Sequence, residues 1–220
     1  MTQRWPASEA DLAAVVVAWL ERECWDVYQE VSIGPVADIV ARRGPVLWVI
    51  ETKRAMSLSV IGQAQRWAPY AHLRSVAVPS TRGDAGRDMA HEVCRRWGIG
   101  VLDVSRSGVH ERVDPRLTRH RSTKLRDALA PEHRTYAAAG SARGERWSHW
   151  RGTCDRLRKA VAESPGVTLR EALGGMEHHY SSNASARTSM AHWVREGKVS
   201  GVRCVAEGRV LRLYPAEPGA

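Results

Sequence analysis

Three charged residues that could take part in a reaction lie near one another in the sequence: Asp38, Glu51 and Lys53. Asp38 interrupts one apolar run, a Gly-Pro turn follows, and a second apolar run over 46–50 leads directly into Glu51. Because side chains alternate along a strand, Glu51 and Lys53 share one face and Thr52 takes the other. We therefore expect a hairpin that holds two carboxylates and one amine close together.

Such a group suits metal-assisted hydrolysis of a phosphodiester. Two carboxylates repel each other at close range, so a pair usually indicates a cation between them, and oxygen ligands suit Mg²⁺ or Mn²⁺. The metal ion would polarise a phosphoryl oxygen and lower the pKa of its water, while the lysine steadies the developing negative charge. The alternative is an ordinary surface hairpin whose charges are solvated or paired.

The strand that ends in Glu51-Thr52-Lys53, with Asp38 on the strand before it, resembles the PD-(D/E)xK phosphodiesterases, which include restriction endonucleases and archaeal Holliday junction resolvases. The resemblance implies an α/β fold with a restriction endonuclease-like α-β-β-β-α-β core. It also implies that Asp38 and Glu51 bind Mg²⁺ or Mn²⁺ and that Lys53 is the catalytic base or positions water. One departure is Ala37, which stands where the family's motif has proline.

A helix is expected over residues 9–23, because apolar residues recur there at helical spacing and Ser8 with Asp11 forms a near capping box before them. In the nucleases that the chain resembles, a glutamate on this helix often completes the metal site. Glu9 is our candidate for that catalytic and metal-binding role, and Glu21 is the reserve. The alternative is that Glu9 only complements the helix dipole.

A second candidate of this kind is Gln63, on a helix expected over 57–71. In several branches of the resembled superfamily, a glutamine on this helix reaches back to the site or to DNA, often with an aromatic residue four positions later. Gln63 and Trp67 match that spacing. The alternative is that Gln63 is simply a good helix former on a solvated face.

The first strand is expected over 25–33, with alternation around Val27 and Val31. Glu30 would then face away from Val27 and Val31 and could border the site. We rank it below Glu9 as a ligand.

Two strands over 73–79 and 99–104 flank a helix over 85–97, whose expected core stripe is Met89, Val93 and Trp97. Strand, helix, strand order is typical of parallel crossover units. We expect the nuclease-like domain to span residues 1–105. Residues 106–146 are rich in Arg, His, Ser and Gly and predict a basic linker with a short helix near 124–129, which either follows a phosphate backbone or is a solvated connector.

Residues 147–220 form the second expected domain. Three helices and then two strands around a Glu-Gly turn are predicted there, which resembles a winged helix-turn-helix. If this domain binds DNA, the resemblance places Ser182, Asn183, Ser185 and Arg187 in the major groove and Arg203 and Arg209 of the wing on phosphates. The alternative is a module for dimerisation or for docking another protein.

The composition of the chain narrows the classes of function that it can have. The 220 residues carry a formal charge of +9, which favours a polyanionic partner. The four cysteines show no Cys-x-x-Cys pair, so a zinc ribbon or disulfide framework is not indicated. Because the sequence has neither a signal peptide nor an apolar run near the ~18 residues of a membrane span, we expect a cytoplasmic protein without a membrane partner.

The sequence thus predicts a metal-dependent DNA endonuclease of repair, recombination or defence, acting on double-stranded or branched DNA. The resemblance also implies a homodimer, since many nucleases of this class act as dimers. The alternative from another class is a non-catalytic DNA-binding or regulatory protein on a nuclease-derived fold.

Overall fold

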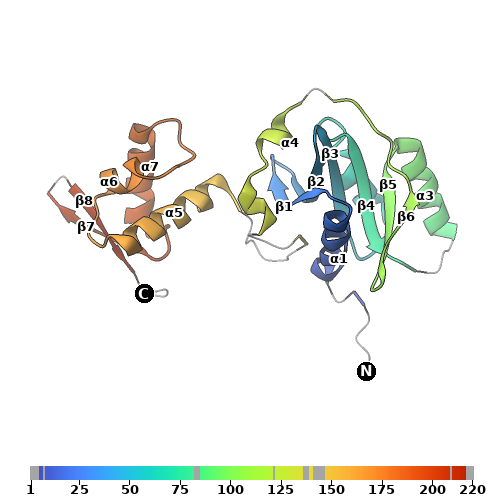
Figure 1. Ribbon diagram of the computed structural model, residues 1–220, viewed down its shortest axis with the longest axis horizontal. Coiled ribbons are helices and arrows are strands. Elements are labelled where there is room, and N and C mark those ends of the chain that lie inside the picture. The colour runs from blue at the N-terminus through green and yellow to red at the C-terminus, as the bar shows by residue number, and fades with distance from the viewer. Residues whose placement is uncertain are drawn as a thin grey trace. The chain divides into compact units, whose positions relative to one another are not determined.

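The computed structural model describes residues 5–6, 8–81, 85–120, 122–135, 139–140, 147–208 and 210–216. The chain divides into two compact units, Met1–Trp147 and Ser148–Ala220. The elements of the first unit are α1 (Glu9–Arg22), β1 (Asp26–Ser32), β2 (Val36–Arg43), β3 (Val46–Thr52), α2 (Leu58–Gln65), β4 (Leu73–Pro79), α3 (Ala85–Trp97), β5 (Gly100–Ser105), β6 (Gly108–Val113), α4 (Lys124–Asp127) and the 3₁₀ helix η1 (Pro131–Arg134) (Figure 1).

The first unit is built on a six-stranded sheet with the strand order β1-β2-β3-β4-β5-β6 (Figure 1). β1, β2 and β3 are antiparallel neighbours, β4 is parallel to both β3 and β5, and β6 is antiparallel to β5. The hairpin of β2 and β3 and the parallel pairing of β4 with β5 confirm the sequence predictions. The unit is therefore mixed α/β.

α1 covers one face of this sheet. Ser8 and Asp11 exchange side-chain and backbone hydrogen bonds, which completes the capping box. Leu12, Val16 and Leu20 recur on one side of the helix and are fully buried against β2, β3, β4 and β5. Each such burial contributes about 1.5 to 3 kcal/mol. This packing fixes the position of the first turn of α1.

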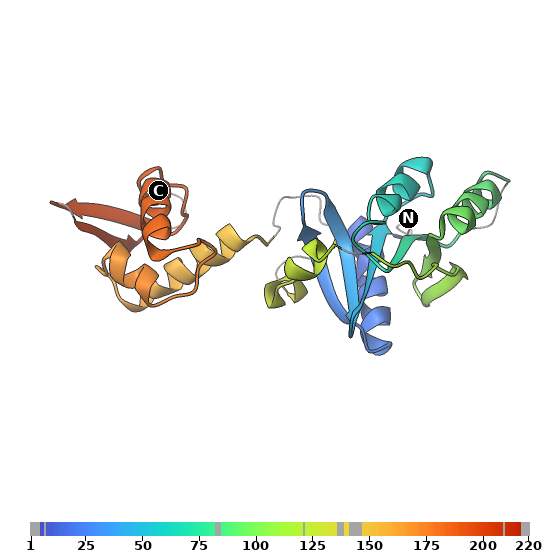
Figure 2. The ribbon, with the colours of Figure 1, turned by 90° about the horizontal axis from the view of Figure 1, so that it is seen from above.

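α2 and α3 cover the opposite face (Figure 2). Val76 and Val78 of β4 pack with both of these helices, whereas Ala77 between them packs with α1. Alternate residues of one strand point to opposite sides of a sheet. The carboxyl ends of β3 and β4 therefore lie between helices on both faces.

The expected core stripe of α3 is wrong. Met89 is 66% exposed and Trp97 is 49% exposed, whereas Cys94 is fully buried and Ala90 and Val93 pack partly against the core. The helix thus contacts the sheet through a face turned from the expected one by about one residue, or roughly 100°. Met89 is left at the surface.

The expectation of a linker over 106–146 and of a domain ending at residue 105 is also wrong for the residues that the structure describes there. β6 pairs with β5, which satisfies backbone groups that would otherwise lie at an open sheet edge. Leu125 is fully buried against β1, β2 and β3, and His133 and Ala139 are buried as well. These residues belong to the first unit.

The second unit consists of α5 (His149–Glu163), α6 (Leu169–Gly174), α7 (Asn183–Arg195), β7 (Val202–Glu207) and β8 (Val210–Pro215). Its core includes Leu157, Leu173, Met190 and Leu213, which lie on all three helices and the hairpin. The order of three helices and a hairpin agrees with the sequence prediction. Among the described residues, no helix is both long and apolar enough to cross a membrane.

Candidate active site

The site begins where β2 and β3 stop pairing. Their backbone ladder reaches Ile39 and Ile50 and is not continued to Asp38. There the Thr52 backbone N–H and hydroxyl both donate to Oδ2 of Asp38, at 2.8 and 3.1 Å. The carboxylate of Asp38 therefore takes the place of a backbone partner, and one of its oxygens is fixed.

Glu51 lies at the end of the apolar part of β3 and is 3% exposed. The indole of Trp67 donates a hydrogen bond from Nε1 to Oε1 of Glu51 at 2.6 Å. Burial and the negative charge of Asp38 raise the pKa of Glu51 to about 7, against the lowering effect of Trp67, Arg66 and Lys53. Burial also raises the pKa of Asp38, and the hydrogen bonds of Thr52 only partly offset it. The two acids are close enough to resist ionising together.

Each acid has one oxygen held and one oxygen left for a ligand. Among the described residues, no hydrogen bond reaches Oδ1 of Asp38 or Oε2 of Glu51. Carboxylate oxygens are hard donors, which suit Mg²⁺ or Mn²⁺. A divalent cation would favour the ionised forms of both acids, whose pKa values are raised chiefly by burial. The residues present therefore fit the metal ion that the sequence implied.

Gln63, the other candidate, lies on α2, four positions before Trp67. Its amide oxygen Oε1 is buried and has no hydrogen-bond partner among the described residues. A buried acceptor without a donor is costly, which is consistent with a ligand or water binding there.

Lys53 reaches α1 and not the acids of its own hairpin. Its Nζ donates to Oε2 of Glu9 at 2.8 Å, and the side chains are 34% and 30% exposed. Burial lowers the pKa of Lys53, but the hydrogen bond and charge of Glu9 and the charges of Asp38 and Glu51 raise it further, so the net pKa is raised. Lys53 is therefore an ammonium cation at neutral pH.

Glu9 was expected to bind the metal ion with the two acids. The structure instead pairs it with Lys53, although its charge also raises the pKa of Asp38. Among the described residues, no group of three or more His, Cys, Asp or Glu side chains could hold one metal ion. The positions of the side chains thus support Asp38 and Glu51 as metal ligands. The role of Glu9 as a metal ligand stays a prediction.

Glu30 is the acid whose position was least foreseeable. The register of β1 with β2 joins Gln29 to Ile39 and Val31 to Ala37, so Glu30 lies at an irregularity opposite Asp38. Its φ is +53° and its side chain is 3% exposed. The alternation expected for β1 is therefore wrong: Val27 packs with α1, whereas Val31 packs on the other face.

Two consecutive side chains of β1 hold a distant segment over the start of α1. Gln29 accepts a hydrogen bond from the Ala139 N–H at 2.8 Å, and Glu30 accepts one from the Gly140 N–H at 2.9 Å. Gly140 has φ of +74°, and a Cβ there would lie 2.8 Å from the carbonyl carbon of Glu9. Residues 139–140 therefore support the turn that presents Glu9 to Lys53.

The candidate DNA-binding residues of the second unit lie at the start of α7. Ser182 is the N-cap and accepts a hydrogen bond from the Ser185 N–H at 3.1 Å, and Oδ1 of Asn183 lies 2.7 Å from Nε2 of His178. Ser182, Asn183, Ser185 and Arg187 are all exposed. Two of the four expected base readers thus already have partners within the unit.

The wing is described in part. The guanidinium of Arg203, on β7, stacks over the ring of Tyr214 on β8, 4.9 Å from its centroid. Arg209, the other expected phosphate contact, lies outside the described residues.

Comparison with known proteins does not assign a function to the chain. No protein-family model and no curated protein matches the chain. Among solved structures, the SPO1766 protein of unknown function from Silicibacter pomeroyi is similar with a TM-score of 0.42 and 14% sequence identity, over 77% of this chain and 94% of that chain.

Proposed function

We propose that the first unit is a metal-dependent phosphodiesterase of the PD-(D/E)xK type that cleaves DNA. The observation that carries the proposal is the pair of acids near the start of β2 and the end of β3. Asp38 and Glu51 each have one oxygen held by the protein and one that accepts no hydrogen bond from the described residues, beside a lysine held as a cation. The element order α1-β1-β2-β3-α2-β4 supports it too, because the sequence resemblance implies that order.

In this proposal Asp38 and Glu51 would hold Mg²⁺ or Mn²⁺, and the bound ion would polarise the scissile phosphate and lower the pKa of a water molecule. Thr52 and Trp67 keep those carboxylates from rotating, since each donates to the other oxygen of one acid.

The raised pKa of Lys53 favours one of its two expected roles. An ammonium with a raised pKa is a poor acceptor for a proton at neutral pH. The same cation stabilises negative charge that develops on the phosphoryl oxygens in the transition state. We therefore assign Lys53 to charge stabilisation and water positioning, with Glu9 orienting it.

We propose that the second unit is a winged helix-turn-helix that binds DNA. Support comes from its three helices and hairpin, from the exposed Ser185 and Arg187 at the start of α7, and from the net positive charge of the chain. Arginine side chains on such a surface would contact phosphates or base edges.

The test is cleavage of a panel of linear, flapped and four-way DNAs, with an RNA control, in Mg²⁺, Mn²⁺ or EDTA. Wild type should cleave at least one DNA only when metal is present. Asp38→Ala and Lys53→Ala should each lower the rate by about a hundredfold or more. Asp127→Asn, a change of an exposed acid on the same unit, should cleave as wild type does.

Cleavage that survives both substitutions refutes the site. Metal-independent DNA binding without cleavage of any substrate favours the alternative, a regulatory DNA-binding protein.

A further inference from the structure

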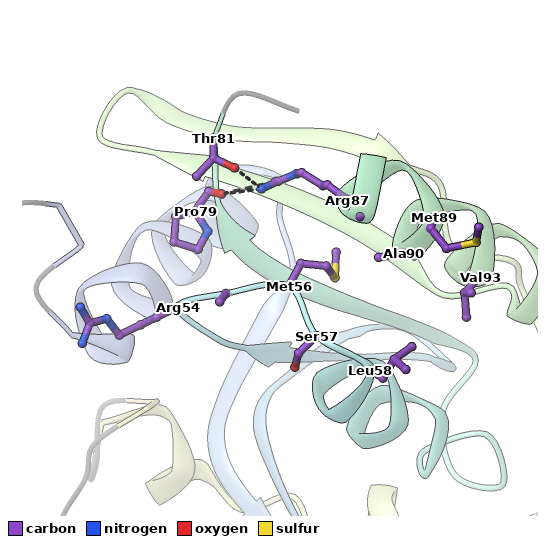
Figure 3. Close-up of a pocket in the computed structure, with 12 residues that line it drawn as sticks. Arg54, Met56, Ser57, Leu58, Pro79, Thr81, Arg87, Met89, Ala90 and Val93 are labelled. Atoms are coloured by element: carbon purple, nitrogen blue, oxygen red, sulfur yellow. Dashed lines mark hydrogen bonds between the residues drawn. The ribbon is translucent and has the colours of Figure 1, made fainter. Parts of the chain in front are cut away.

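The chain that follows Lys53 borders a cavity at the carboxyl ends of β3 and β4 (Figure 3). Its volume is about 560 Å³, which lies within the range of small-ligand sites. The wall is mainly apolar, with Met56, Leu58, Pro79, Met89, Ala90 and Val93 contributed by β4, α3 and the start of α2. A cavity of this size and lining, next to the candidate active site, could hold a flat apolar group.

The two arginines at this cavity differ in what they are free to do. Arg87 donates to the carbonyl of Pro79 and to Thr81 and pairs with Asp103, so it is part of the wall. Arg54 directly follows Lys53, is exposed, and has no hydrogen bond or ion pair with another described residue. Arg54 is therefore available to an anion that comes from outside the chain.

Arg54 also lines a second cavity. This cavity of about 520 Å³ is lined by Trp5, Pro6 and Ser80 and shares Arg54, Pro79 and Thr81 with the first. In Figure 3 the side chain of Arg54 points away from Met56, Leu58 and Met89. One groove thus presents a cation on one side and an apolar wall on the other.

That combination matches a single nucleotide, whose phosphate is an anion and whose base is flat and apolar on its faces. Leu58 is 75% exposed and Met89 is 66% exposed, so both are uncovered in the free protein. Methionine thioethers make favourable contacts with aromatic rings and adapt to their shape. In an intact duplex the bases are stacked inside, so only an unpaired or extruded nucleotide could enter the apolar side.

We propose that this groove binds an unpaired nucleotide next to the scissile phosphate, with its base against Met56, Leu58 and Met89 and a phosphate on Arg54. The substrates preferred by the enzyme are then DNAs with unpaired nucleotides, such as flaps, branched ends and single-stranded tails. This inference rests on the proposed function and narrows its substrate class.

The test measures binding by the full-length protein in Ca²⁺, as fluorescence anisotropy with two labelled probes. One probe is a fully paired duplex and the other is the same duplex with a single-stranded flap. Wild type should bind the flapped probe at least about fivefold more tightly, in line with the contribution of one stacked base. Leu58→Asp and Met89→Asp should bring that ratio close to one.

Leu117→Asp is the matched control. Leu117 is 63% exposed but does not line the cavity, so it introduces the same charge at an equally exposed apolar position. This variant should keep the wild-type ratio. Because the second unit is unchanged in every variant, its own affinity for DNA cancels in the comparison.

Equal affinity of wild type for the two probes, or an unchanged ratio in both Leu58→Asp and Met89→Asp, would overturn the inference. Metal-dependent cleavage that makes no distinction between paired and flapped DNA would overturn it as well, and would leave the proposed hydrolytic site standing. Absence of any cleavage together with the expected flap preference would instead refute the proposed function and retain the nucleotide site.

Discussion

Trp67, in the turn that follows α2, donates a hydrogen bond of 2.6 Å to Glu51 on β3, and both side chains are buried. This hydrogen bond lowers the pKa of Glu51, whereas burial and Asp38 raise it. The indole thus favours the ionised form of the acid that the proposal needs as a ligand.

Trp67→Phe should keep most of the packing and remove the donor. The pKa of Glu51 should rise, and the acid limb of the rate profile in Mg²⁺ should move to higher pH. Trp48→Phe is the control, because Trp48 is also buried and donates from Nε1, but to Ser75. Each variant should lose about 1 to 3 kcal/mol of stability, and only Trp67→Phe should shift the profile. If both variants shift the rate profile equally, the effect comes from a general loss of packing and not from the hydrogen bond to Glu51.

Glu51 makes the metal-free protein less stable at alkaline pH. Its folded-state pKa is about 7 against an ordinary 4.5, so the folded protein holds this proton more tightly than the unfolded chain. The stability that protonated Glu51 contributes is complete below the pKa of this group in the unfolded chain. It is lost as pH rises through about 7, by an amount on the order of 3 kcal/mol. In EDTA at pH 8, Glu51→Gln should therefore raise the melting temperature by several degrees.

Mg²⁺ should raise the melting temperature of wild type and leave that of Glu51→Gln almost unchanged. Asp127→Asn, at an exposed acid, should behave as wild type in both buffers. A Glu51→Gln variant that melts below wild type at pH 8 in EDTA would contradict this account.

Glu9→Gln tests whether Glu9 orients Lys53 and keeps it protonated. Glu9 raises the pKa of Lys53 through a hydrogen bond and through its charge, so its neutralisation should lower that pKa. The basic limb of the rate profile should then move to lower pH, with a decrease in kcat. The loss of stability should stay below about 1 kcal/mol, because both side chains are about one-third exposed. If the basic limb does not move, Lys53 does not supply the charge stabilisation that limits the rate.

Gly140→Ala tests the support of the first turn of α1. The substitution adds a Cβ within 2.8 Å of Glu9 at a backbone angle that favours glycine. Gly44→Ala is the matched control, because Gly44 has φ of +55° and no atom within 4 Å of the added Cβ. Both should lose about 1 kcal/mol from backbone strain. Gly140→Ala should lose more than that, because its Cβ meets backbone atoms of α1, and only this variant should also lose activity. Equal activity of the two variants would show that this contact does not position Glu9.

Arg187→Ala tests the second unit. If Arg187 contacts a phosphate, its loss should weaken DNA binding at low salt and reduce by about one the slope of log affinity against log salt. Arg195→Ala, at the other end of α7, should leave the slope unchanged. A slope near zero for wild type would favour a protein-docking role for this unit.

The sequence was informative where a short pattern determines geometry. An apolar run on each side of a Gly-Pro turn predicted the hairpin, and the proximity of Asp38 and Glu51 follows from its register. The cap of α1 was equally legible, since Ser8 accepts the backbone N–H of Asp11 at the start of the helix. The roles of these acids stay predictions until cleavage is measured.

The sequence was less informative where a few buried contacts outweigh a polar composition. β6 has only Val113 buried, so its pattern did not differ from that of a linker. Leu125 and Ala139 likewise anchor segments that are otherwise polar. The positive φ of Glu30 carried no signal, because no glycine marks the irregularity. The hydrogen bond of Thr52 to Asp38 depends on where two strands separate, which strand alternation does not specify.

The contact of Gly140 with Glu9 sets an order of events during synthesis. The helix that carries Glu9 leaves the ribosome first, but the residues that brace it follow only after all six strands have been made. A nascent chain that ends after β5 would carry both acids and the lysine and still lack the brace. If the first unit cleaves DNA as proposed, that activity should therefore arise late, once the whole first unit has been translated.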